Sequence, residues 1–307
     1  MKENIAVVGG GLMGLGIAST FCRNEHQVSL WEPVASQREH LTERLKTLLA
    51  DDGCDPGLAS HLRILNRIED LGDDLSIVFE AGPEKLPVKH SIFESLVQHT
   101  GPHTILASNT SVIPITAIAD GLPMDHRRRI IGTHWWNPAN LIPLVEVVHT
   151  EYADSDMLKA AFHLLERVGK QPVYVEKDVA GFIGNRLQHA LWREAHALIS
   201  AGVCSPETID IVVKNSFGLR LPAFGPIENA DMVGLDLTMD IHNVVLRELS
   251  QAKTPLPALT QRVERNELGA KTGQGFLHWD DAKKQQVQQR LNQHIRTMLK
   301  SQKGEPS

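Results

Sequence analysis

Short apolar runs alternate with amphipathic stretches along roughly the first 180 residues of the chain. Such runs of β-branched and apolar residues predict strands, and the stretches between them have the apolar spacing of helices. The predicted strands are residues 5–8, 28–31, 77–79, 104–107, 130–131, 144–148 and 172–175. Strands that alternate with helices are typical of βαβ units, so this part of the chain predicts a mainly parallel sheet.

From Gly181 onward the apolar residues recur at helical spacing, and no clear strand-like run follows. Ser205 before a proline predicts the start of one helix, and Thr254 before a proline predicts another. Residues 303–307 are polar and are expected to fray. The pattern therefore predicts an α/β N-terminal domain, residues 1–182, and an all-helical C-terminal domain, residues 183–307.

A glycine-rich turn follows the first predicted strand directly. Gly9, Gly11 and Gly14 form the pattern G-x-G-x-x-G, and Leu12 and Met13 within it begin a helix expected over about residues 12–23. The first glycine allows a tight turn, the second lets the backbone approach a pyrophosphate, and the third lets helix and strand pack closely. The helix N-terminus favours an anion. These features predict a Rossmann dinucleotide-binding domain, with an ordinary glycine-rich turn as the alternative.

Glu32 ends the next predicted strand, eighteen residues after Gly14. A carboxylate there can accept hydrogen bonds from the adenosine ribose hydroxyls and repels a 2′-phosphate. Glu32 therefore predicts NAD rather than NADP as the cofactor. An exposed carboxylate at a strand end is the alternative.

A histidine and a glutamate point to alcohol oxidation. His134 comes at the carboxyl end of a short strand, where open α/β sheets place their chemistry, and imidazole can take a proton near neutral pH. Glu146 lies on the following strand, and a reversal at Asn137 can bring its carboxylate to the other imidazole nitrogen. Together they predict a His/Glu dyad, unless His134 is an ordinary packing histidine and Glu146 an edge-strand glutamate that faces water. Asn109 and Ser111 follow another strand, where they form either a polar part of the site or a turn.

The composition limits the kinds of molecule that the protein is expected to bind. The net charge is −6 and no long Lys/Arg block occurs, so a small molecule is expected rather than a nucleic acid or a membrane. The three cysteines lie far apart outside any C-x-x-C pattern, which predicts neither a disulfide framework nor a metal site. Because no signal-like leader and no run of 18 apolar residues occurs, a cytoplasmic protein is expected.

The assembled motifs resemble the L-3-hydroxyacyl-CoA dehydrogenase family over nearly the whole chain. They are residues 9–14, 78–81 with Glu84 and Lys89, 108–111, 134–138 with Glu146, 181–186 and 271–276. The resemblance implies NAD-dependent conversion of a 3-hydroxyacyl-CoA to a 3-ketoacyl-CoA, as in fatty acid metabolism. It also implies a homodimer formed through the C-terminal helices, and a substrate cleft between the two domains.

The resemblance further implies roles for individual residues. His134 is the general base and Glu146 its partner, while the groups around the substrate oxygen and the nicotinamide are Ser111, Asn137 and Asn185. Glu80 and Lys89 correspond to positions near the nicotinamide end of the cofactor. The cofactor-binding residues are thus predicted to be Gly9, Gly11, Leu12, Met13, Gly14, Glu32, Glu80, Lys89 and Asn109.

The chain departs from the acyl-CoA pattern next to the histidine. Trp135 and Trp136 replace paired phenylalanines, and Pro143 lies in a segment that resembles relatives acting on gulonate, carnitine or pyridine carboxylates. The resemblance places the segment of residues 37–74 near CoA, but its cations are only diffuse among many carboxylates, which weakens the CoA interpretation without excluding it. A dehydrogenase of a non-CoA hydroxy acid is therefore an alternative. Two further hypotheses are a β-hydroxyacid dehydrogenase with a lysine base and a catalytically inert NAD-binding protein like those of eye lenses.

Overall fold

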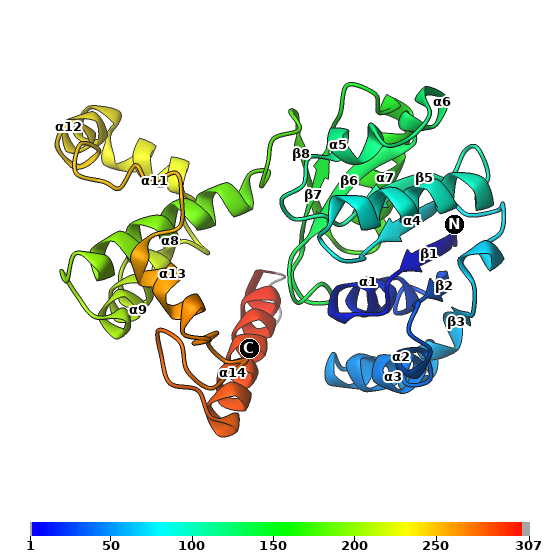
Figure 1. Cartoon of the computed structure of the whole chain (residues 1–307), viewed down its shortest axis with the longest axis horizontal. Coiled ribbons are helices and arrows are strands. Elements are labelled where there is room, and N and C mark those ends of the chain that lie inside the picture. The colour runs from blue at the N-terminus through cyan, green and yellow to red at the C-terminus, as the bar shows by residue number, and fades with distance from the viewer. Residues whose placement is uncertain (1, 303–307) are drawn as a thin grey trace. The chain divides into compact units, whose positions relative to one another are not determined.

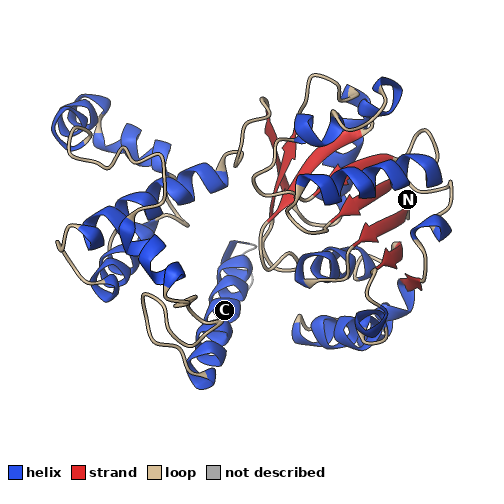
Figure 2. Ribbon diagram, in the orientation of Figure 1, coloured by secondary structure: helices blue, strands red, loops and turns tan. Residues whose placement is uncertain are grey.

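The structure is a computed structural model, and it describes residues 2–302. Residues 303–307, which are predicted to fray, lie outside the described residues. The chain forms two compact units that meet in sequence between Asn185 and Arg186, three residues after the predicted domain boundary. All the strands of the described chain belong to the N-terminal unit (Figures 1 and 2).

One sheet of eight strands forms the centre of the N-terminal unit. The strands are β1 (Asn4–Val8), β2 (Gln27–Trp31), β3 (Leu62–Leu65), β4 (Ile77–Glu80), β5 (Ile105–Ser108), β6 (Ile130–Trp135), β7 (Leu144–Val148) and β8 (Gln171–Val175). Their order is β3-β2-β1-β4-β5-β6-β7-β8, and every pair is parallel except β6 with β7. The predicted α/β class with a mainly parallel sheet is confirmed. The pattern missed β3, in which a charged residue interrupts a very short apolar run.

Helices cover both faces of this sheet. They are α1 (Leu12–Cys22), α2 (Ala35–Arg38), α3 (Leu41–Asp51), α4 (Leu86–His99), α5 (Ile115–Ala119), α6 (Met124–Arg127) and α7 (Ser155–Arg167), with short 3₁₀ turns η1 (Pro56–His61) and η2 (Ile68–Asp70). Successive strand residues point to opposite faces, so Ile5 and Val7 of β1 pack with α1, α3 and α7. Ala6 and Val8 pack with α4 and α5 on the other face.

The strand order reverses at β1, which lies between β2 and β4. The helices that follow β1 and β4 leave the sheet in opposite directions, and this opens a crevice outside the carboxyl ends of the strands. Val8 at the end of β1 is opposite Trp31 of β2 and Glu80 of β4. The fold therefore collects the ends of β1, β2, β4, β5 and β6, with the predicted site residues that follow them, along one edge of the sheet.

The C-terminal unit contains helices only. They are α8 (Gly184–Ser200, begun in the N-terminal unit), α9 (Pro206–Asn215), α10 (Phe217–Arg220), α11 (Pro226–Val233), α12 (Leu235–Val245), α13 (Pro257–Glu264) and α14 (Asp281–Gln302). Ser205 caps α9 as predicted, because its hydroxyl accepts from the Thr208 N–H at 3.2 Å. The predicted helix start at Thr254 is wrong: α13 begins at Pro257. A residue before proline is driven out of the helical region, and Leu256 is extended.

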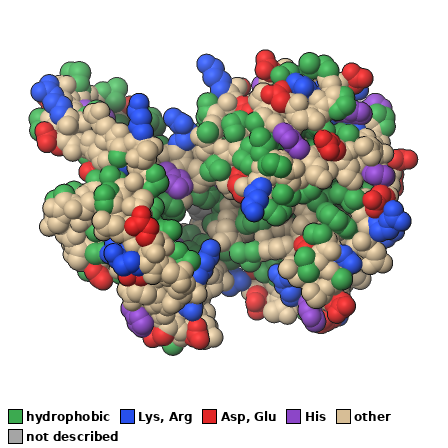
Figure 3. Space-filling view, viewed as in Figure 1, with side chains coloured by type: hydrophobic (Ala, Val, Ile, Leu, Met, Phe, Trp, Pro, Cys, Tyr) green, Lys and Arg blue, Asp and Glu red, His purple; other side chains and the backbone are tan. Residues whose placement is uncertain are grey.

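The helices of the C-terminal unit bury little apolar surface in this single chain. Ala258 is the only hydrophobic residue that is buried within residues 186–302. Helices α9, α10, α11 and α12 contain no buried residue, and Figure 3 shows hydrophobic side chains at the surface of this unit. Over residues 2–302, no helix is both long and apolar enough to cross a membrane.

Candidate active site

The predicted His/Glu pair is formed across two antiparallel strands. His134 of β6 is directly opposite Glu146 of β7, so both side chains lie on the same face of the sheet. The His134 Nδ1 and Glu146 Oε2 atoms are 2.7 Å apart, and both side chains are buried. Because a carboxylate only accepts, Nδ1 holds a proton and Nε2 is the basic nitrogen of the neutral ring. Within residues 2–302 no group is hydrogen-bonded to Nε2.

Glu146 is held by donors from three other residues. Its Oε1 accepts from the backbone N–H groups of Ile183 and Gly184, at 2.9 and 3.0 Å, where α8 begins. Its Oε2 also accepts from Trp136 Nε1 at 3.3 Å. Burial raises the pKa of Glu146, but the hydrogen bonds from His134, Gly184 and Ile183 outweigh burial and hold this pKa below its usual value. The carboxylate therefore stays ionised beside the imidazole at neutral pH.

The two tryptophans after His134 have different surroundings. Trp135 is a core residue, and its ring packs edge-on against Phe79 at 5.7 Å. Trp136 lies against the imidazole of His134, with ring centroids 5.3 Å apart. A Cβ atom built on Gly184 would be only 2.3 Å from Trp136 Cζ2, so the indole occupies the space that a side chain at position 184 would need. The aromatic pair thus divides into one core residue and one residue of the site.

A polar loop after β5 lies next to the start of α8. Asn185 Nδ2 donates to the Ser111 carbonyl at 2.9 Å, which brings together two of the predicted substrate-binding residues. Glu84 Oε1 accepts from the Thr110 hydroxyl at 2.6 Å and from the backbone N–H groups of Ser111 and Val112. Burial raises the pKa of Glu84, but these bonds and the charge of Lys89 hold the pKa below its usual value. Glu84 therefore fixes the loop on which Ser111 is placed.

Glu80 and Lys89 form a buried ion pair with each other. The lysine Nζ is 2.9 Å from both carboxylate oxygens, and both side chains are fully buried. Glu80 also accepts from the Ser108 hydroxyl at 2.6 Å and from the Gly82 N–H at 2.7 Å. A buried charge needs this compensation. The pair therefore ties β4, β5 and α4 together, and its predicted place at the nicotinamide end of the cofactor stays a prediction.

Asn109 and Asn137 differ from each other in their contacts. Asn109 Oδ1 accepts from the Trp135 N–H at 2.8 Å, so this side chain joins the end of β5 to β6. Asn137 is exposed and lines a surface hollow of about 280 Å³ together with Leu12 and Asn140. No hydrogen bond within residues 2–302 links the Asn137 side chain to His134. Their predicted roles in binding stay predictions.

The glycine-rich turn has the geometry that the pattern requires. Gly9 has a φ of +106°, which favours glycine, and a Cβ on Gly14 would lie 1.8 Å from the Gly9 carbonyl oxygen. A Cβ on Gly11 would meet nothing within 4 Å. Gly11 is the N-cap of α1, and no side chain caps this helix end. The first N–H groups of α1 thus face open space beside a positive helix terminus.

Comparisons with known proteins agree along most of the chain. The family model "3-hydroxyacyl-CoA dehydrogenase, NAD binding domain" matches residues 4–179, and the model of the C-terminal domain of the same family matches residues 181–279. The chain belongs to the 3-hydroxyacyl-CoA dehydrogenase family. Members of this family are NAD-dependent enzymes, so the predictions of the family, of an enzyme and of NAD are confirmed.

Several relatives of this dehydrogenase cover most of its length. A probable 3-hydroxybutyryl-CoA dehydrogenase of Bacillus subtilis is 34% identical over 91% of this chain and 98% of its own. A 5-formyl-3-hydroxy-2-methylpyridine 4-carboxylate 5-dehydrogenase of Mesorhizobium japonicum is 32% identical over 90% and 91%. A solved structure of an enzyme with the latter activity, named as an NAD⁺-dependent dismutase, has a TM-score of 0.92, 29% identity and full coverage of both chains. The structure of (S)-3-hydroxybutyryl-CoA dehydrogenase from Ralstonia eutropha has a TM-score of 0.73 and 28% identity, over 92% and 100%.

The dehydrogenase has groups that fit NAD. The open space at Gly11 and the uncapped end of α1 suit a pyrophosphate. Glu32 is buried and accepts from the Gly10 N–H at 2.8 Å and from the Val34 N–H at 3.0 Å. A carboxylate has about four acceptor positions, so Glu32 retains capacity for ribose hydroxyls. These residues would hold the dinucleotide as the pattern predicts.

Two site residues of the dehydrogenase were not singled out by the pattern. In the sequence Glu84 is only one residue of a family motif, and a carboxylate in a loop gives no signal of the backbone groups that it binds. Gly184 is likewise one residue of a motif, and the space it must leave is set by Trp136, which is 48 positions away. Both roles depend on contacts that spacing along the chain does not show.

Proposed function

We propose that this dehydrogenase oxidises the hydroxyl group of a 3-hydroxyacyl-type substrate, with His134 as general base and Glu146 as its partner. The observation that supports the proposal is the 2.7 Å contact between His134 Nδ1 and Glu146 Oε2. It leaves Nε2 as the acceptor of the alcohol proton. Bound NAD would supply the hydride acceptor for the carbinol carbon, so that the products are a ketone, NADH and one proton, which His134 holds first.

The remaining groups of the site support the imidazole during this step. Ionised Glu146 stabilises the imidazolium that forms when His134 takes the proton. Trp136 and Phe182 lie beside the ring, with centroids 5.3 and 5.6 Å away, and limit its contact with water. Ser111 and Asn185 are proposed to hydrogen-bond the substrate oxygen. General-base catalysis of this kind contributes roughly 10²- to 10⁴-fold in rate.

A second candidate is a carboxylate substrate that is not bound to CoA. Several cations of residues 37–74, the segment that the resemblance places near CoA, contact groups of the protein itself. Arg38 donates to the Glu32 carbonyl at 2.6 Å, and Lys46 pairs with Glu43 at 2.7 Å. The TM-score of 0.92 with the pyridine-carboxylate enzyme, against 0.73 with the hydroxybutyryl-CoA enzyme, favours this candidate. A free aromatic or aliphatic hydroxy acid is its expected substrate.

The proposal also covers the oligomeric state and the cellular location of the enzyme. Most of the large hydrophobic residues that are exposed in the described chain lie in the C-terminal unit, on α9, α11 and α12 among others. A second copy of the chain would cover them, which supports a homodimer through the C-terminal helices. We also propose a cytoplasmic enzyme, in fatty acid metabolism if its substrate is a CoA thioester.

The base is tested by His134→Ala beside His163→Ala, a matched change at an exposed histidine. His134→Ala should lower kcat by about 10²- to 10⁴-fold while NADH still binds, and His163→Ala should leave both unchanged. Near-wild-type turnover of His134→Ala would contradict the mechanism. Binding of NADH without turnover of any substrate by the wild type would instead indicate an inert protein.

The substrate is tested by NAD reduction on paired compounds. The panel is 3-hydroxybutyryl-CoA, 3-hydroxybutyrate, gulonate, carnitine and 5-formyl-3-hydroxy-2-methylpyridine 4-carboxylate. Activity on the thioester alone would support the first candidate and exclude the second. Activity on a free acid with none on the thioester would support the second candidate and exclude the first.

A further inference from the structure

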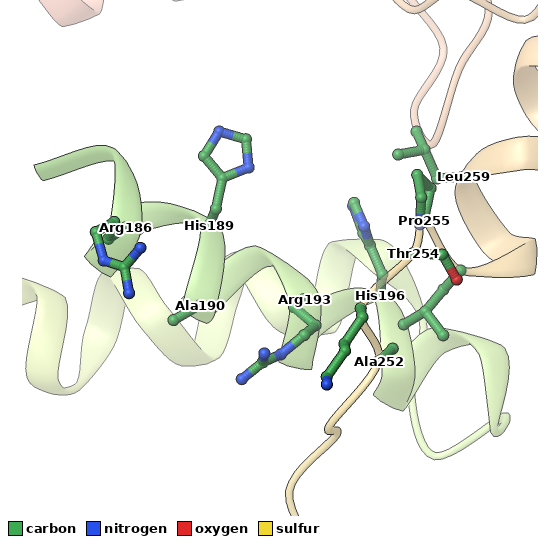
Figure 4. Close-up of a pocket in the computed structure, with 11 residues that line it drawn as sticks. Arg186, His189, Ala190, Arg193, His196, Ala252, Thr254, Pro255 and Leu259 are labelled. Atoms are coloured by element: carbon green, nitrogen blue, oxygen red, sulfur yellow. The ribbon is translucent and has the colours of Figure 1, made fainter. Parts of the chain in front are cut away.

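A hollow of about 600 Å³ lies in the C-terminal unit beside α8, and its lining contains none of the residues assigned above. One wall is the helix itself, and the other is the segment of residues 252–259. Figure 4 shows Arg186, His189, Arg193 and His196 on successive turns of α8, with the chain at Thr254 passing beside the His196 end of this row. The volume is within the range of about 300–1,000 Å³ that small-molecule sites occupy.

The lining of this hollow has one sign of charge. Arg186 and Arg193 come from one face of α8, because positions separated by seven residues lie on the same side of a helix. Lys253 comes from the segment of residues 252–259, and none of the eleven lining residues is Asp or Glu. This is unusual in a chain whose acidic residues outnumber its lysines and arginines, 37 to 31. The lining itself therefore supplies positive charge and no carboxylate.

Some cations elsewhere in this unit are paired with carboxylates. Lys214 pairs with Asp210 at 3.0 Å, and Arg265 pairs with Glu267 at 2.9 Å. Arg193, in contrast, forms no ion pair with any residue from 2 to 302, although Glu194 follows it directly.

The carboxylate of Glu194 accepts from the Ser250 N–H at 2.7 Å. Lys253 likewise has no ionic partner in the described part of the chain. An anion from solution would supply the missing charge.

The rest of the lining is apolar or uncharged. Ala190, Pro255, Leu256 and Leu259 contribute hydrocarbon surface. The imidazole of His196 is stacked on a phenylalanine ring, and burial, with a smaller effect of a nearby arginine, lowers its pKa. A ligand of this hollow therefore meets cations on one part and apolar surface on another.

We propose that this hollow binds a small organic anion, with a carboxylate or phosphate group placed on Arg193 and Lys253 and an apolar body against Pro255 and Leu259. Guanidinium groups bind both kinds of acid through paired hydrogen bonds. The assignment does not depend on the dehydrogenase reaction, so a binding experiment tests it without turnover.

The test is calorimetric titration of the full-length protein with three probes of similar shape. They are phenyl phosphate, benzene-1,3-dicarboxylate and the neutral benzene-1,3-dicarboxamide. At least one anion should bind at least about tenfold more tightly than the diamide, since charge-assisted contacts are the stronger ones. The two anions distinguish a phosphate ligand from a carboxylate ligand.

The location is tested by the double variant Arg193→Gln/Lys253→Gln. It should weaken binding of the anion by about tenfold or more, since one lost charge-assisted hydrogen bond already has this effect. The control Arg220→Gln/Lys300→Gln removes the same charge elsewhere in the unit and should leave binding unchanged. In the wild type, the imidazole NMR signals of His189 and His196 should shift on titration, which tests the location without any variant.

Three results would overturn the proposal. The first is equal affinity for the anions and the diamide. The second is equal weakening in the two double variants. The third is the absence of binding, with unmoved histidine signals, as expected if a second copy of the chain covers the hollow.

Discussion

At the scale of single residues, the smallest side chain in the site has the most constrained position. Gly184 donates its N–H to Glu146, and a Cβ at this position would lie 2.3 Å from Trp136 Cζ2. We expect Gly184→Ala to displace the indole and the carboxylate beside it. A displacement of about 1 Å in a site costs about 10²-fold in rate, and overpacking costs about 1–3 kcal/mol of stability. Steady-state kinetics and thermal unfolding measure the two effects.

A second change separates this steric effect from a general loss of structure. Trp136→Phe removes the ring atoms that an alanine at position 184 would meet. The double variant Gly184→Ala/Trp136→Phe should therefore turn over faster than Gly184→Ala alone, a coupling between residues in contact. If the double variant loses the product of the two single losses, the indole is not what restricts position 184.

Site residues that the sequence predicts have partners that are close along the chain, whereas the residues that it does not predict have partners that are far away along the chain. His134 and Glu146 were predicted because neighbouring strands and one reversal suffice to pair them. Lys170 gave no signal, since a lysine between a glycine and a glutamine indicates a surface turn. Its burial is set by carbonyl groups about 30 positions earlier, at Ala139 and Ile142. Contacts of that range follow only from the assembled sheet.

At the scale of elements, two glycines of the β1–α1 turn have different roles: Gly14 is required for packing, and Gly11 is proposed to allow cofactor binding. Gly14→Ala places a Cβ 1.8 Å from the Gly9 carbonyl oxygen, so we expect a loss of about 1–3 kcal/mol in the free energy of unfolding. Gly11→Ala meets nothing within 4 Å, and its stability should change by less than about 1 kcal/mol. Its methyl group enters the space assigned to the pyrophosphate, so NADH affinity should fall by about tenfold or more.

Denaturant unfolding and NADH fluorescence titration measure these two quantities. The experiment contrasts two glycines of one motif, so each variant is the control of the other. If Gly11→Ala binds NADH with wild-type affinity, the pyrophosphate does not lie beside Gly11.

The loop between β6 and β7 depends on a buried lysine. Lys170 Nζ donates to the carbonyl groups of Ala139 and Ile142, at 2.6 and 2.8 Å, and lies 5.0 Å from the centroid of the Trp135 ring. Burial, with a smaller contribution from Arg23, lowers the pKa of Lys170 to about 7. In the unfolded chain a lysine has a pKa of about 10.4. Between these values the unfolded state binds more protons than the folded state.

We therefore expect Lys170 to make stability rise with pH from about 7 to about 10, with a slope of at most about 1.4 kcal/mol per pH unit. Lys170→Met should remove this part of the slope and, because two carbonyl groups lose their donor, lower stability throughout. Denaturant unfolding at several pH values measures both. Lys159→Met, at an exposed lysine of α7, should keep the wild-type slope. An unchanged slope in Lys170→Met would show that Lys170 is not the titrating group.

At the scale of the whole molecule, the two units differ in how they are stabilised. The N-terminal unit has two clusters of buried hydrophobic residues, one on each face of its sheet. Residues 186–302 have one buried hydrophobic residue, Ala258. Because apolar burial is the main favourable contribution to folding, the C-terminal unit needs additional covered surface to be stable. A second copy of the chain is the partner that the proposed homodimer supplies.

Charge placed on this apolar surface tests the dimer. Leu235 and Met239 are one turn apart on α12, and their side chains are 63% and 60% exposed in the single chain. Sedimentation velocity should give the wild type about twice the 34.0 kDa mass of the chain, and Leu235→Glu/Met239→Glu should shift it towards that mass. The double variant should also unfold at a lower temperature, because an obligate dimer loses stability when its subunits separate.

Met124→Glu is the control, since Met124 is 64% exposed in the N-terminal unit and should tolerate a charge. A monomeric wild type, or a double variant with wild-type mass and stability, would mean that the exposed faces of α12 are covered in another way.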